Sequence, residues 1–307
     1  MIDKAVILVY NTKKGKGEDM YPHELFLGLG LYEIFVAIAL VLALFLADKL
    51  SVRRKYSVKL QRHFIFCFIL AVGIGYLGAV LMQGIYNFIQ TGEFSLTSGM
   101  TFYGGLVVGA VTFILYWFFG ARFLGVTEEA KEKFKDMADI AACVIPLVHG
   151  IGRLGCLFAG CCHGGLTDAW YGTVQHNVVV GGVYYESAKV VPVQLFEALF
   201  LFALSAGLFL LFFRHDKRKE TRFPLLPLYV VAYGIWRFCI EYARADERGQ
   251  TVIAFLSPSQ LVAIILVAVG VAYFALWRKF RYSKDKERAL VEQSVKAEKN
   301  GADGAKK

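Results

Sequence analysis

Two arginines lie inside long apolar runs of this sequence, where a soluble protein would have no reason to put them. Arg153 lies in the run VHGIGRLGCLFAGCCHG, and Arg237 lies in the run LYVVAYGIWRFCIEY. An ionised arginine near the centre of a bilayer costs about 2.5–3.5 kcal/mol, so such charges usually face the interior of a protein and have a function. The forked guanidinium also matches phosphate oxygens in a bidentate way. The two arginines therefore indicate a site for an anionic lipid head group.

The residues around Arg153 add further reactive groups. His149, Arg153 and Cys156 are spaced i, i+4 and i+7, which places an imidazole, a fixed cation and a thiol on one face of a helix. Four neighbouring glycines would let another helix or a substrate approach the backbone closely: 150, 152, 155 and 160. The alternative for His149 is a neutral, hydrogen-bonded histidine in a packing seam, but packing gives no reason for the guanidinium.

The run around Arg237 follows the same logic. Arg237 and Glu241 are spaced i, i+4 and can pair on one helical face. A structural ion pair that only neutralises two buried charges is the alternative. Arg244 and Asp246 follow within a few residues, and four charges favour a polar site over simple neutralisation.

Two tyrosines lie near the predicted outer face. Tyr103, followed by Gly104 and Gly105, opens the predicted third helix, and Tyr32 lies early in the first. Either tyrosine could instead belong to the aromatic belt that is common at membrane interfaces.

Three cysteines cluster with a histidine after Arg153. Cys156, Cys161, Cys162 and His163 offer the ligand types that zinc prefers. Three of the four are consecutive and cannot easily surround a tetrahedral ion, so we predict neither a metal site nor a cofactor. A non-enzymatic redox or metal-sensing membrane protein stays open as an alternative reading of this cluster.

The elements that must position these residues are membrane helices. Of 307 residues, 57% are hydrophobic and 19% charged, with a mean hydropathy of +0.50, which is typical of a polytopic membrane protein. We predict an all-α integral membrane protein of about seven transmembrane helices. Its catalytic domain would cover residues 25–280, between an N-terminal segment, 1–24, and a charged, disordered tail, 281–307. The predicted spans lie near 25–46, 64–86, 102–120, 137–160, 193–213, 225–243 and 260–278.

The basic residues are concentrated in alternate connections. Four stretches hold 25 of the 34 lysines and arginines: 49–62, 122–135, 214–222 and 278–307. The positive-inside rule then predicts an N-terminus outside and a C-terminus in the cytoplasm. Contact with an anionic leaflet explains the net charge of +9, and no basic face of a soluble domain predicts nucleic-acid binding. Residues 1–24 contain no short apolar core followed by a small-residue cleavage site, so we predict no removable signal peptide.

Five motifs, in the same order along the chain, resemble the prolipoprotein diacylglyceryl transferase family. They are YGGLVVG, GRLGCLFAGCCHG, VPVQLFEA, YGIWRFCIEYARAD and SPSQ, and the likeness covers about residues 25–275. The resemblance implies an enzyme of the bacterial inner (cytoplasmic) membrane. Such an enzyme transfers a diacylglyceryl group from phosphatidylglycerol to the lipobox cysteine of a prolipoprotein, forms a thioether and releases glycerol phosphate. Its partners would be these two substrates and membrane lipid.

The resemblance also assigns residues. Arg153 and Arg237 match the family's essential arginines, which bind the phosphate and stabilise its departure. Further positions that match the family and are expected to contact substrate are Tyr32, Gly104, Gly105, Gly164, Glu241 and Arg244, with Cys156 beside them on the Arg153 face.

The sequence departs from many family members at three positions. Tyr103 stands where they have histidine, Cys156 where they have asparagine and Cys161 where they have an acidic residue. The missing histidine matters because a base is needed to form the acceptor thiolate. From its position one turn before Arg153, His149 is the natural replacement, with Tyr103 as the other candidate. The departures also keep open a divergent paralogue with another acceptor.

Overall fold

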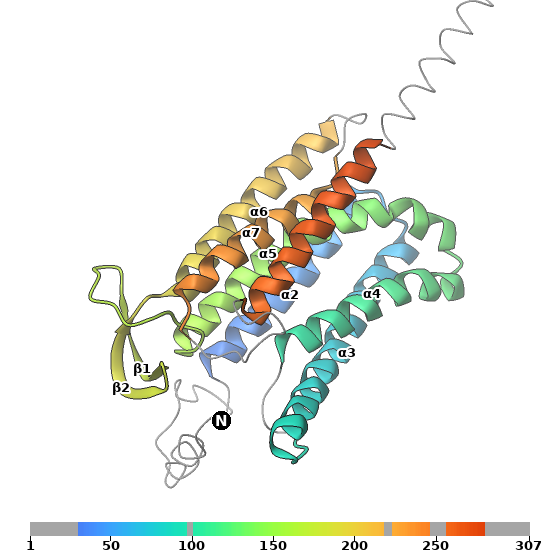
Figure 1. Cartoon of the computed structure of the whole chain (residues 1–307). Helices are drawn as coiled ribbons and strands as arrows, with labels where there is room; N and C mark the ends of the chain where they lie inside the picture. The colour runs from blue at the N-terminus through green and yellow to red at the C-terminus, as the bar shows by residue number, and fades with distance from the viewer. Residues whose placement is uncertain (1–29, 97–100, 218–222, 246–255, 280–307) are drawn as a thin grey trace, which may run out of the picture.

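The computed structural model describes residues 30–96, 101–217, 223–245 and 256–279 (Figure 1). Within these ranges the chain is mainly helical, which confirms the all-α prediction. A helix lies at each of the seven predicted positions: α2 (Leu31–Arg53), α3 (Val58–Thr91), α4 (Phe102–Leu124), α5 (Thr127–Phe158), α6 (Val193–Lys217), α7 (Leu225–Ile240) and an unlabelled last helix, Pro258–Lys279.

Six of the described helices are long and apolar enough to cross a membrane. The exception is α7, which has 16 residues and tightens into a single 3-10 turn, η1 (Glu241–Ala243). The predicted span 225–243 is therefore an α-helix that ends one turn early. By contrast, α3 has 34 residues, a length of about 51 Å, and extends well beyond the predicted 64–86. The predicted segment 1–24 and tail 281–307 lie outside the described residues.

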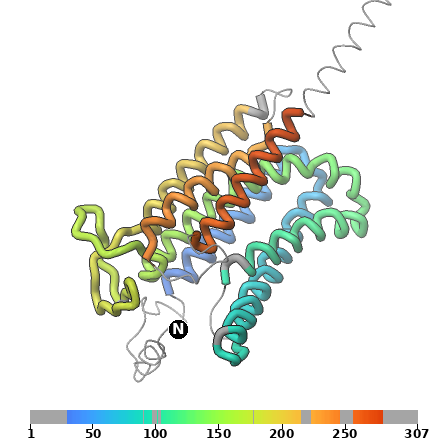
Figure 2. Tube along the Cα trace, viewed as in Figure 1, coloured from blue at the N-terminus to red at the C-terminus, as the bar shows by residue number. Residues whose placement is uncertain are grey.

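The helices form a bundle with a leaning pair beside it. α5 packs against α2, α6 and α7, whereas α3 packs chiefly against α4. In the ribbon and tube views the α3–α4 pair diverges from the bundle toward one end (Figures 1 and 2). Many large apolar side chains of these helices are exposed, as lipid-facing surfaces require.

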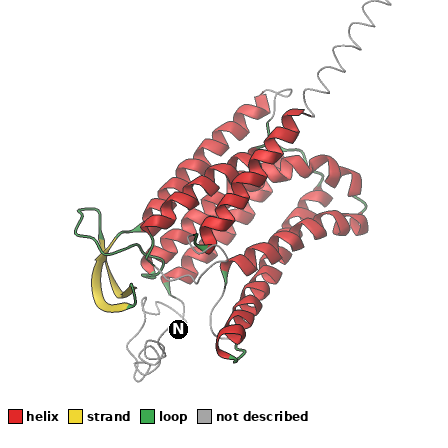
Figure 3. Ribbon diagram, in the orientation of Figure 1, coloured by secondary structure: helices red, strands yellow, loops and turns green. Residues whose placement is uncertain are grey.

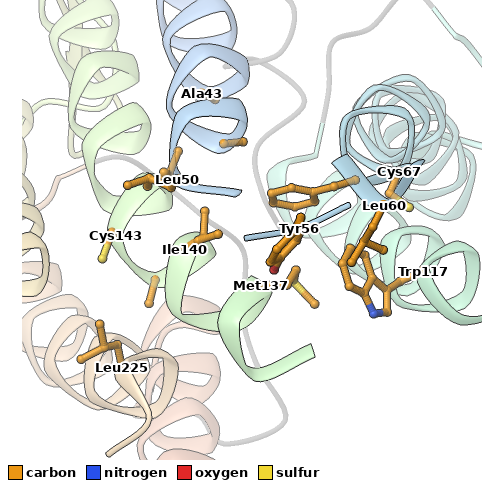
Figure 4. Close-up of a cluster of buried hydrophobic side chains, with 14 of the residues drawn as sticks. Ala43, Leu50, Tyr56, Leu60, Cys67, Trp117, Met137, Ile140, Cys143 and Leu225 are labelled. Carbon is orange, nitrogen blue, oxygen red and sulfur yellow. The ribbon is translucent and has the colours of Figure 1, made fainter. Parts of the chain in front are cut away.

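A buried hydrophobic cluster joins the leaning pair to the bundle (Figure 4). Leu60 and Trp117, from α3 and α4, are fully buried, and Met137 and Ile140 of α5 belong to the same cluster. The Trp117 indole Nε1 donates to the Ala130 carbonyl at 3.1 Å, which satisfies the one polar atom of this large side chain. The two parts are therefore fixed to each other at the end of the bundle far from Arg153.

A β-hairpin between α5 and α6 was not predicted (Figure 3). β1 (Thr173–Val180) and β2 (Val183–Val190) pair antiparallel, with Val180 opposite Val183. The two-residue loop is Gly181–Gly182, with φ angles of +58° and +79°. Positive φ at both positions is the requirement of a type I′ turn, which is favoured in two-residue hairpins. The signal was thus present in the sequence as a glycine pair between β-branched runs.

The C-terminus of α5 is closed by a Schellman motif. Gly160, at φ +66°, donates its N–H to the Leu157 carbonyl, and Cys161 donates to the Cys156 carbonyl. These two bonds satisfy orphan carbonyls of the helix end. The chain then turns sharply, which brings residues 161–165 back toward the start of α6.

A short backbone ladder holds this turn in place. Gly164 donates to the Val191 carbonyl at 2.9 Å and pairs as an antiparallel bridge with Arg244. A Cβ at Gly164 would lie 2.5 Å from the Ala243 carbonyl oxygen and 2.8 Å from side chains of Val191 and Val193. Only glycine fits at this crossing, which ties the ends of α5, α6 and η1 together.

Candidate active site

Arg153 on α5 faces Glu197 on α6. The Arg153 Nη2 donates to Glu197 Oε1 at 3.2 Å, and its Nε lies 2.9 Å from Oε2. The guanidinium therefore meets both carboxylate oxygens. The Glu197 side chain is fully buried, and 13% of the Arg153 side chain is exposed. The pair is thus a desolvated ion pair with one accessible edge.

Two further side chains converge on Glu197 from other helices. The Tyr233 hydroxyl on α7 donates to Glu197 Oε1 at 3.1 Å, and His149 Nε2 on α5 lies 3.9 Å from the same oxygen. The rings of His149 and Tyr233 meet edge to face at 5.3 Å. The predicted face of His149, Arg153 and Cys156 is therefore a real face of α5, and its first two members share one carboxylate.

Arg237 lies near the end of α7 and is bound to the residues that follow. Its Nη2 lies 2.7 Å from Glu241 Oε2, which confirms the predicted i, i+4 pair, and donates to Ser259 Oγ at 2.9 Å. Its Nη1 is buried and has no hydrogen-bond partner among the described residues. Arg237 therefore has a donor to spare in an environment without free exchange with water.

The SPSQ motif explains how Glu241 is held. Ser257 caps the last helix, since its Oγ accepts from Gln260 N at 3.1 Å while Gln260 Oε1 accepts from Ser257 N at 3.0 Å. This is a capping box, and Pro258 occupies the first helical position, where a missing N–H costs nothing. The same Ser257 hydroxyl donates to Glu241 Oε1 at 2.8 Å. The start of one helix thereby orients the carboxylate that holds Arg237.

Arg244 links the two ion pairs. Its side chain is 2% exposed, with Nη1 3.8 Å from Glu197 Oε2 and Nε 3.9 Å from Glu241 Oε2. The charges therefore form a continuous buried network that alternates in sign, which we call the arginine network: Arg153, Glu197, Arg244, Glu241 and Arg237. Its members come from α5, α6, α7 and η1, and Arg244 directly follows η1.

The cysteines and Tyr32 lie beside the Arg153 end of this network. The Sγ atoms of Cys156, Cys161 and Cys162 lie within 4.8 Å of one another. Tyr32 Cδ2 would lie 3.2 Å from a Cβ at Gly155, so α2 passes α5 closely here. Hydrogen bonds with the Cys156 and Cys161 thiols, together with the charges of Arg244 and Arg153, lower the pKa of Cys162. The hydrogen bonds with Cys156 and Cys162 raise the pKa of Cys161.

Other predicted site residues lie elsewhere or have a packing role. Gly104 and Gly105 face α3: a Cβ at Gly104 would lie 2.6 Å from Met82 Cβ, and one at Gly105 would lie 3.1 Å from Ala79 Cβ. They allow the close packing of α3 on α4. Gly164 is the crossing point of the backbone ladder. Tyr103 lies in the first turn of α4, but its side chain is outside the described part of the structure.

The glycines around Arg153 divide between packing and open space. A Cβ at Gly150 would lie 2.6 Å from Phe202 Cε1 of α6, and one at Gly155 would touch Phe35 and Tyr32 of α2. A Cβ at Gly152 would meet nothing within 4 Å. The surface of α5 beside Arg153 is therefore open at Gly152.

Sequence reasoning missed the residue at the centre of the arginine network. Glu197 lies in VPVQLFEA, a motif that was noted without singling out its glutamate. A lone carboxylate in the apolar run 193–213 is the same kind of signal as Arg153 and could have been read in the same way. Tyr233, Ser257 and Ser259 were also missed, because an uncharged hydroxyl in an apolar run carries little information about its partner.

Comparison with known proteins matches the chain to a named family. The profile of the prolipoprotein diacylglyceryl transferase family matches residues 24–276. A phosphatidylglycerol–prolipoprotein diacylglyceryl transferase of Clostridium tetani is 30% identical over 255 residues, which cover 80% of this chain and 92% of the relative. A second transferase of that name from Clostridium perfringens is 30% identical over 58% of this chain and 62% of its own. One from Dehalococcoides mccartyi is 28% identical over 71% of this chain and 77% of its own.

The matched region spans every member of the arginine network and all seven helices, except the last three residues of Pro258–Lys279. The chain belongs to the prolipoprotein diacylglyceryl transferase family.

Proposed function

We propose that this chain transfers the diacylglyceryl group of phosphatidylglycerol to the thiol of a lipobox cysteine in a prolipoprotein. The products are a thioether-linked lipoprotein precursor and glycerol phosphate. The relatives are named for these two substrates, and six helices long and apolar enough to cross a membrane support a lipid donor.

One observation carries the proposal: two buried guanidiniums from separate helices belong to one network. Arg153 comes from α5 and Arg237 from α7, and Glu197, Arg244 and Glu241 connect them. The Arg237 Nη1 has no acceptor among the described residues, and the α5 backbone beside Arg153 is open at Gly152. A phosphodiester that reached this face would meet preorganised donors in a dry setting, where such donors are strongest.

The reaction needs a thiolate and a leaving group. An ordinary cysteine thiol has a pKa of about 8.5, so a base must take its proton. We assign this role to His149, whose Nε2 lies on the Glu197 side of the site and whose imidazole is held by Tyr233. Tyr103, at the start of α4, is the other candidate base.

The thiolate sulfur then forms a bond to the glycerol carbon that carries the phosphate ester. The carbon–oxygen bond breaks, and its electron pair stays on the phosphate oxygen of the departing glycerol phosphate. Negative charge therefore grows on the phosphate as the bond breaks, and Arg153 and Arg237 would hold it. The carboxylates of Glu197 and Glu241 fix the two guanidiniums before the substrate arrives, so little reorganisation is needed.

The location of the enzyme follows from the same reading. We propose a multi-pass protein of the bacterial cytoplasmic membrane with its N-terminus outside and its C-terminus in the cytoplasm. The arginine network would then lie toward the outer face, since residues 161–165 and η1 follow the outward ends of α5 and α7. A reporter active only in the cytoplasm, fused after Lys307, should be active; an inactive fusion would reverse the topology.

The direct test incubates purified protein with vesicles of phosphatidylglycerol and a synthetic lipobox peptide. The expected products are a peptide heavier by one diacylglyceryl group and an equal amount of glycerol phosphate. Arg153→Ala and Arg237→Ala should each lose this activity by a factor of about 10²–10³, the usual cost of removing a transition-state donor. Arg122→Ala is the matched control, because Arg122 is exposed and lies over Phe119 on α4.

The outcomes separate the site from the substrates. Wild-type activity in both arginine variants would refute the site. If wild-type protein released glycerol phosphate only with an acceptor other than the lipobox peptide, the chain would be a divergent paralogue that uses the same donor chemistry. Replacing phosphatidylglycerol by zwitterionic phosphatidylcholine should abolish the reaction, since the proposed donor is an anionic lipid.

A further inference from the structure

Three of the six cysteines form a compact group at the end of α5. The Sγ atoms of Cys156, Cys161 and Cys162 all lie within 4.8 Å of one another. Cys67, Cys143 and Cys239 lie apart from this group, in the helices α3, α5 and α7. The clustering is therefore a property of this turn and not of the cysteine content in general.

The local backbone brings the sulfurs together. The Schellman motif at Gly160 reverses the chain, so that Cys161 donates its N–H to the Cys156 carbonyl at 3.2 Å. Cys162 adopts a left-handed conformation, φ +64°, which is uncommon for a residue with a side chain. We expected no metal site here because three of the four candidate ligands are consecutive residues. The turn removes that obstacle for three sulfurs.

The group is held by contacts outside itself. Gln194 is fully buried at the start of α6, and its Nε2 donates to the Cys161 carbonyl at 2.6 Å. The backbone ladder at Gly164 ties the same turn to Val191 and to residues 243–245. The sulfurs therefore lie on a fixed frame, as a binding site requires, and not on a free loop.

The dimensions suit a thiolate-bound metal ion. A metal–sulfur bond of about 2.3 Å sets sulfur atoms about 3.8–4.0 Å apart around a tetrahedral or trigonal ion. The observed upper limit of 4.8 Å is within a small side-chain rotation of that spacing. Cys161 is exposed and the other two are partly buried, so an ion can reach the group. His163 does not complete the set through Nδ1, which lies 3.0 Å from the Gly164 carbonyl oxygen.

The surrounding charges favour such a complex. Three thiolates around one Zn²⁺ or Cu⁺ ion leave a net negative charge, which would be costly near a membrane without compensation. Arg153 interacts electrostatically with Cys156 and Cys162, and Arg244 interacts with Cys162. The cationic side of the arginine network thus compensates the thiolates.

We propose that Cys156, Cys161 and Cys162 form a three-sulfur site for a thiophilic d10 metal ion, of the class of Zn²⁺ and Cu⁺. Sulfur ligands select soft ions over Mg²⁺ and Ca²⁺, which bind through oxygen. The test of this site is independent of the proposed transferase function, because its readouts are metal content and thiol reactivity.

The test compares two triple variants of the full-length protein in detergent. The protein is reduced with a phosphine, freed of metal with a chelator, loaded with Zn²⁺ or Cd²⁺ and separated from excess ion. Wild type and the control Cys67→Ala/Cys143→Ala/Cys239→Ala should retain one ion per chain. Cys156→Ala/Cys161→Ala/Cys162→Ala should retain none, and Cd²⁺ should give a thiolate charge-transfer band in the first two proteins only.

A second measurement needs no variant and covers the case in which the site variant does not fold. Alkylation of wild-type protein, followed by peptide mass spectrometry, should be slowed at least tenfold by Zn²⁺ at Cys156, Cys161 and Cys162, while Cys239 is unaffected. Equal alkylation with and without Zn²⁺ would overturn the proposal, as would equal metal content in the two triple variants. Protection by Mg²⁺ at the same concentration would also overturn it, since a thiolate site should ignore that ion.

Discussion

Replacing Glu197 by glutamine tests the centre of the arginine network. The substitution keeps the shape of the side chain and leaves an oxygen that can still accept from the Tyr233 hydroxyl, observed at 3.1 Å. It removes the negative charge that faces Arg153 at 2.9 Å and Arg244 at 3.8 Å. Arg244 keeps Glu241 at 3.9 Å, so Arg153 is the group that loses most.

The size of the effect follows from these distances. At an effective dielectric constant of about 20, an ion pair about 3–4 Å apart is worth about 4–6 kcal/mol. Measured costs of removing one partner of a buried pair are about 3–5 kcal/mol, because the other charge stays buried. Glu197 is fully buried and Arg153 nearly so, so we expect Glu197→Gln to lower the free energy of unfolding by about 3–5 kcal/mol.

The assay is a titration of the purified protein with sodium dodecyl sulfate, followed by the loss of helical signal, with and without added lipid. Glu186→Gln is the matched control, because Glu186 is exposed on β2. Phosphatidylglycerol should restore more stability to Glu197→Gln than to wild type, since its phosphate would replace the missing charge beside Arg153. Phosphatidylcholine should restore less, because its net charge is zero.

Two results would refute this reasoning. If Glu197→Gln lay within about 1 kcal/mol of the control, the network would not be the desolvated ion assembly that the distances describe. If the two lipids restored stability equally, the phosphate would not occupy the place of the lost carboxylate.

Three further predictions follow from individual contacts. Arg237→Lys keeps the charge and a nitrogen for Glu241 and Ser259, both of which Nη2 contacts, but removes Nη1, the donor left for a phosphate. We therefore expect kcat to fall by about 10²–10³ in the lipobox peptide assay; unchanged kcat, with Arg122→Lys as the control, would contradict a phosphate-binding role. Gly164→Ala puts a Cβ 2.5 Å from the Ala243 carbonyl oxygen and should lower stability by about 1–3 kcal/mol. Gly152→Ala, whose Cβ would meet nothing within 4 Å, should be neutral or slightly stabilising. Thermal unfolding of the two variants side by side tests this, and equal midpoints would argue against the backbone ladder at Gly164. Ser257→Ala removes the helix cap and the hydroxyl that donates to Glu241, so we expect a loss of about 0.5–2 kcal/mol in the same unfolding titration and a lower affinity for phosphatidylglycerol; a variant with wild-type stability would show that the cap is dispensable.

Some of the site could be predicted because buried charge is rare. Arg153, Arg237 and Glu241 stand out in apolar runs, and the i, i+4 spacing alone predicted the pair that the structure contains at 2.7 Å. The same rule marks Glu197 as a buried charge, without identifying it as the partner of Arg153. The partner itself could not be read from spacing, since 44 residues separate the two side chains.

The hairpin and the sulfur cluster show a different limit. The pair Gly181–Gly182 indicates a tight turn, but whether the flanking valines form strands depends on their pairing. The three cysteines are visible in the sequence, yet their convergence depends on one left-handed residue and one helix cap. Local propensity favours the Gly160 cap but disfavours the left-handed Cys162, and contacts from α6 and from residues 243–245 stabilise this turn.

The sequence by itself determined the membrane class, the helix positions and the family, because these depend on hydrophobicity and local motifs that repeat within short windows. It also indicated that Arg153 and Arg237 lie inside the protein, because each stands in an apolar run. Only the tertiary structure decided which charge meets which. Glu197, Arg244 and the Ser257 cap come from separate elements, and the Gly164 crossing holds the ends of α5, α6 and η1 together. Which residues of distant helices meet depends on how the helices pack, and the type of a single residue does not reveal this.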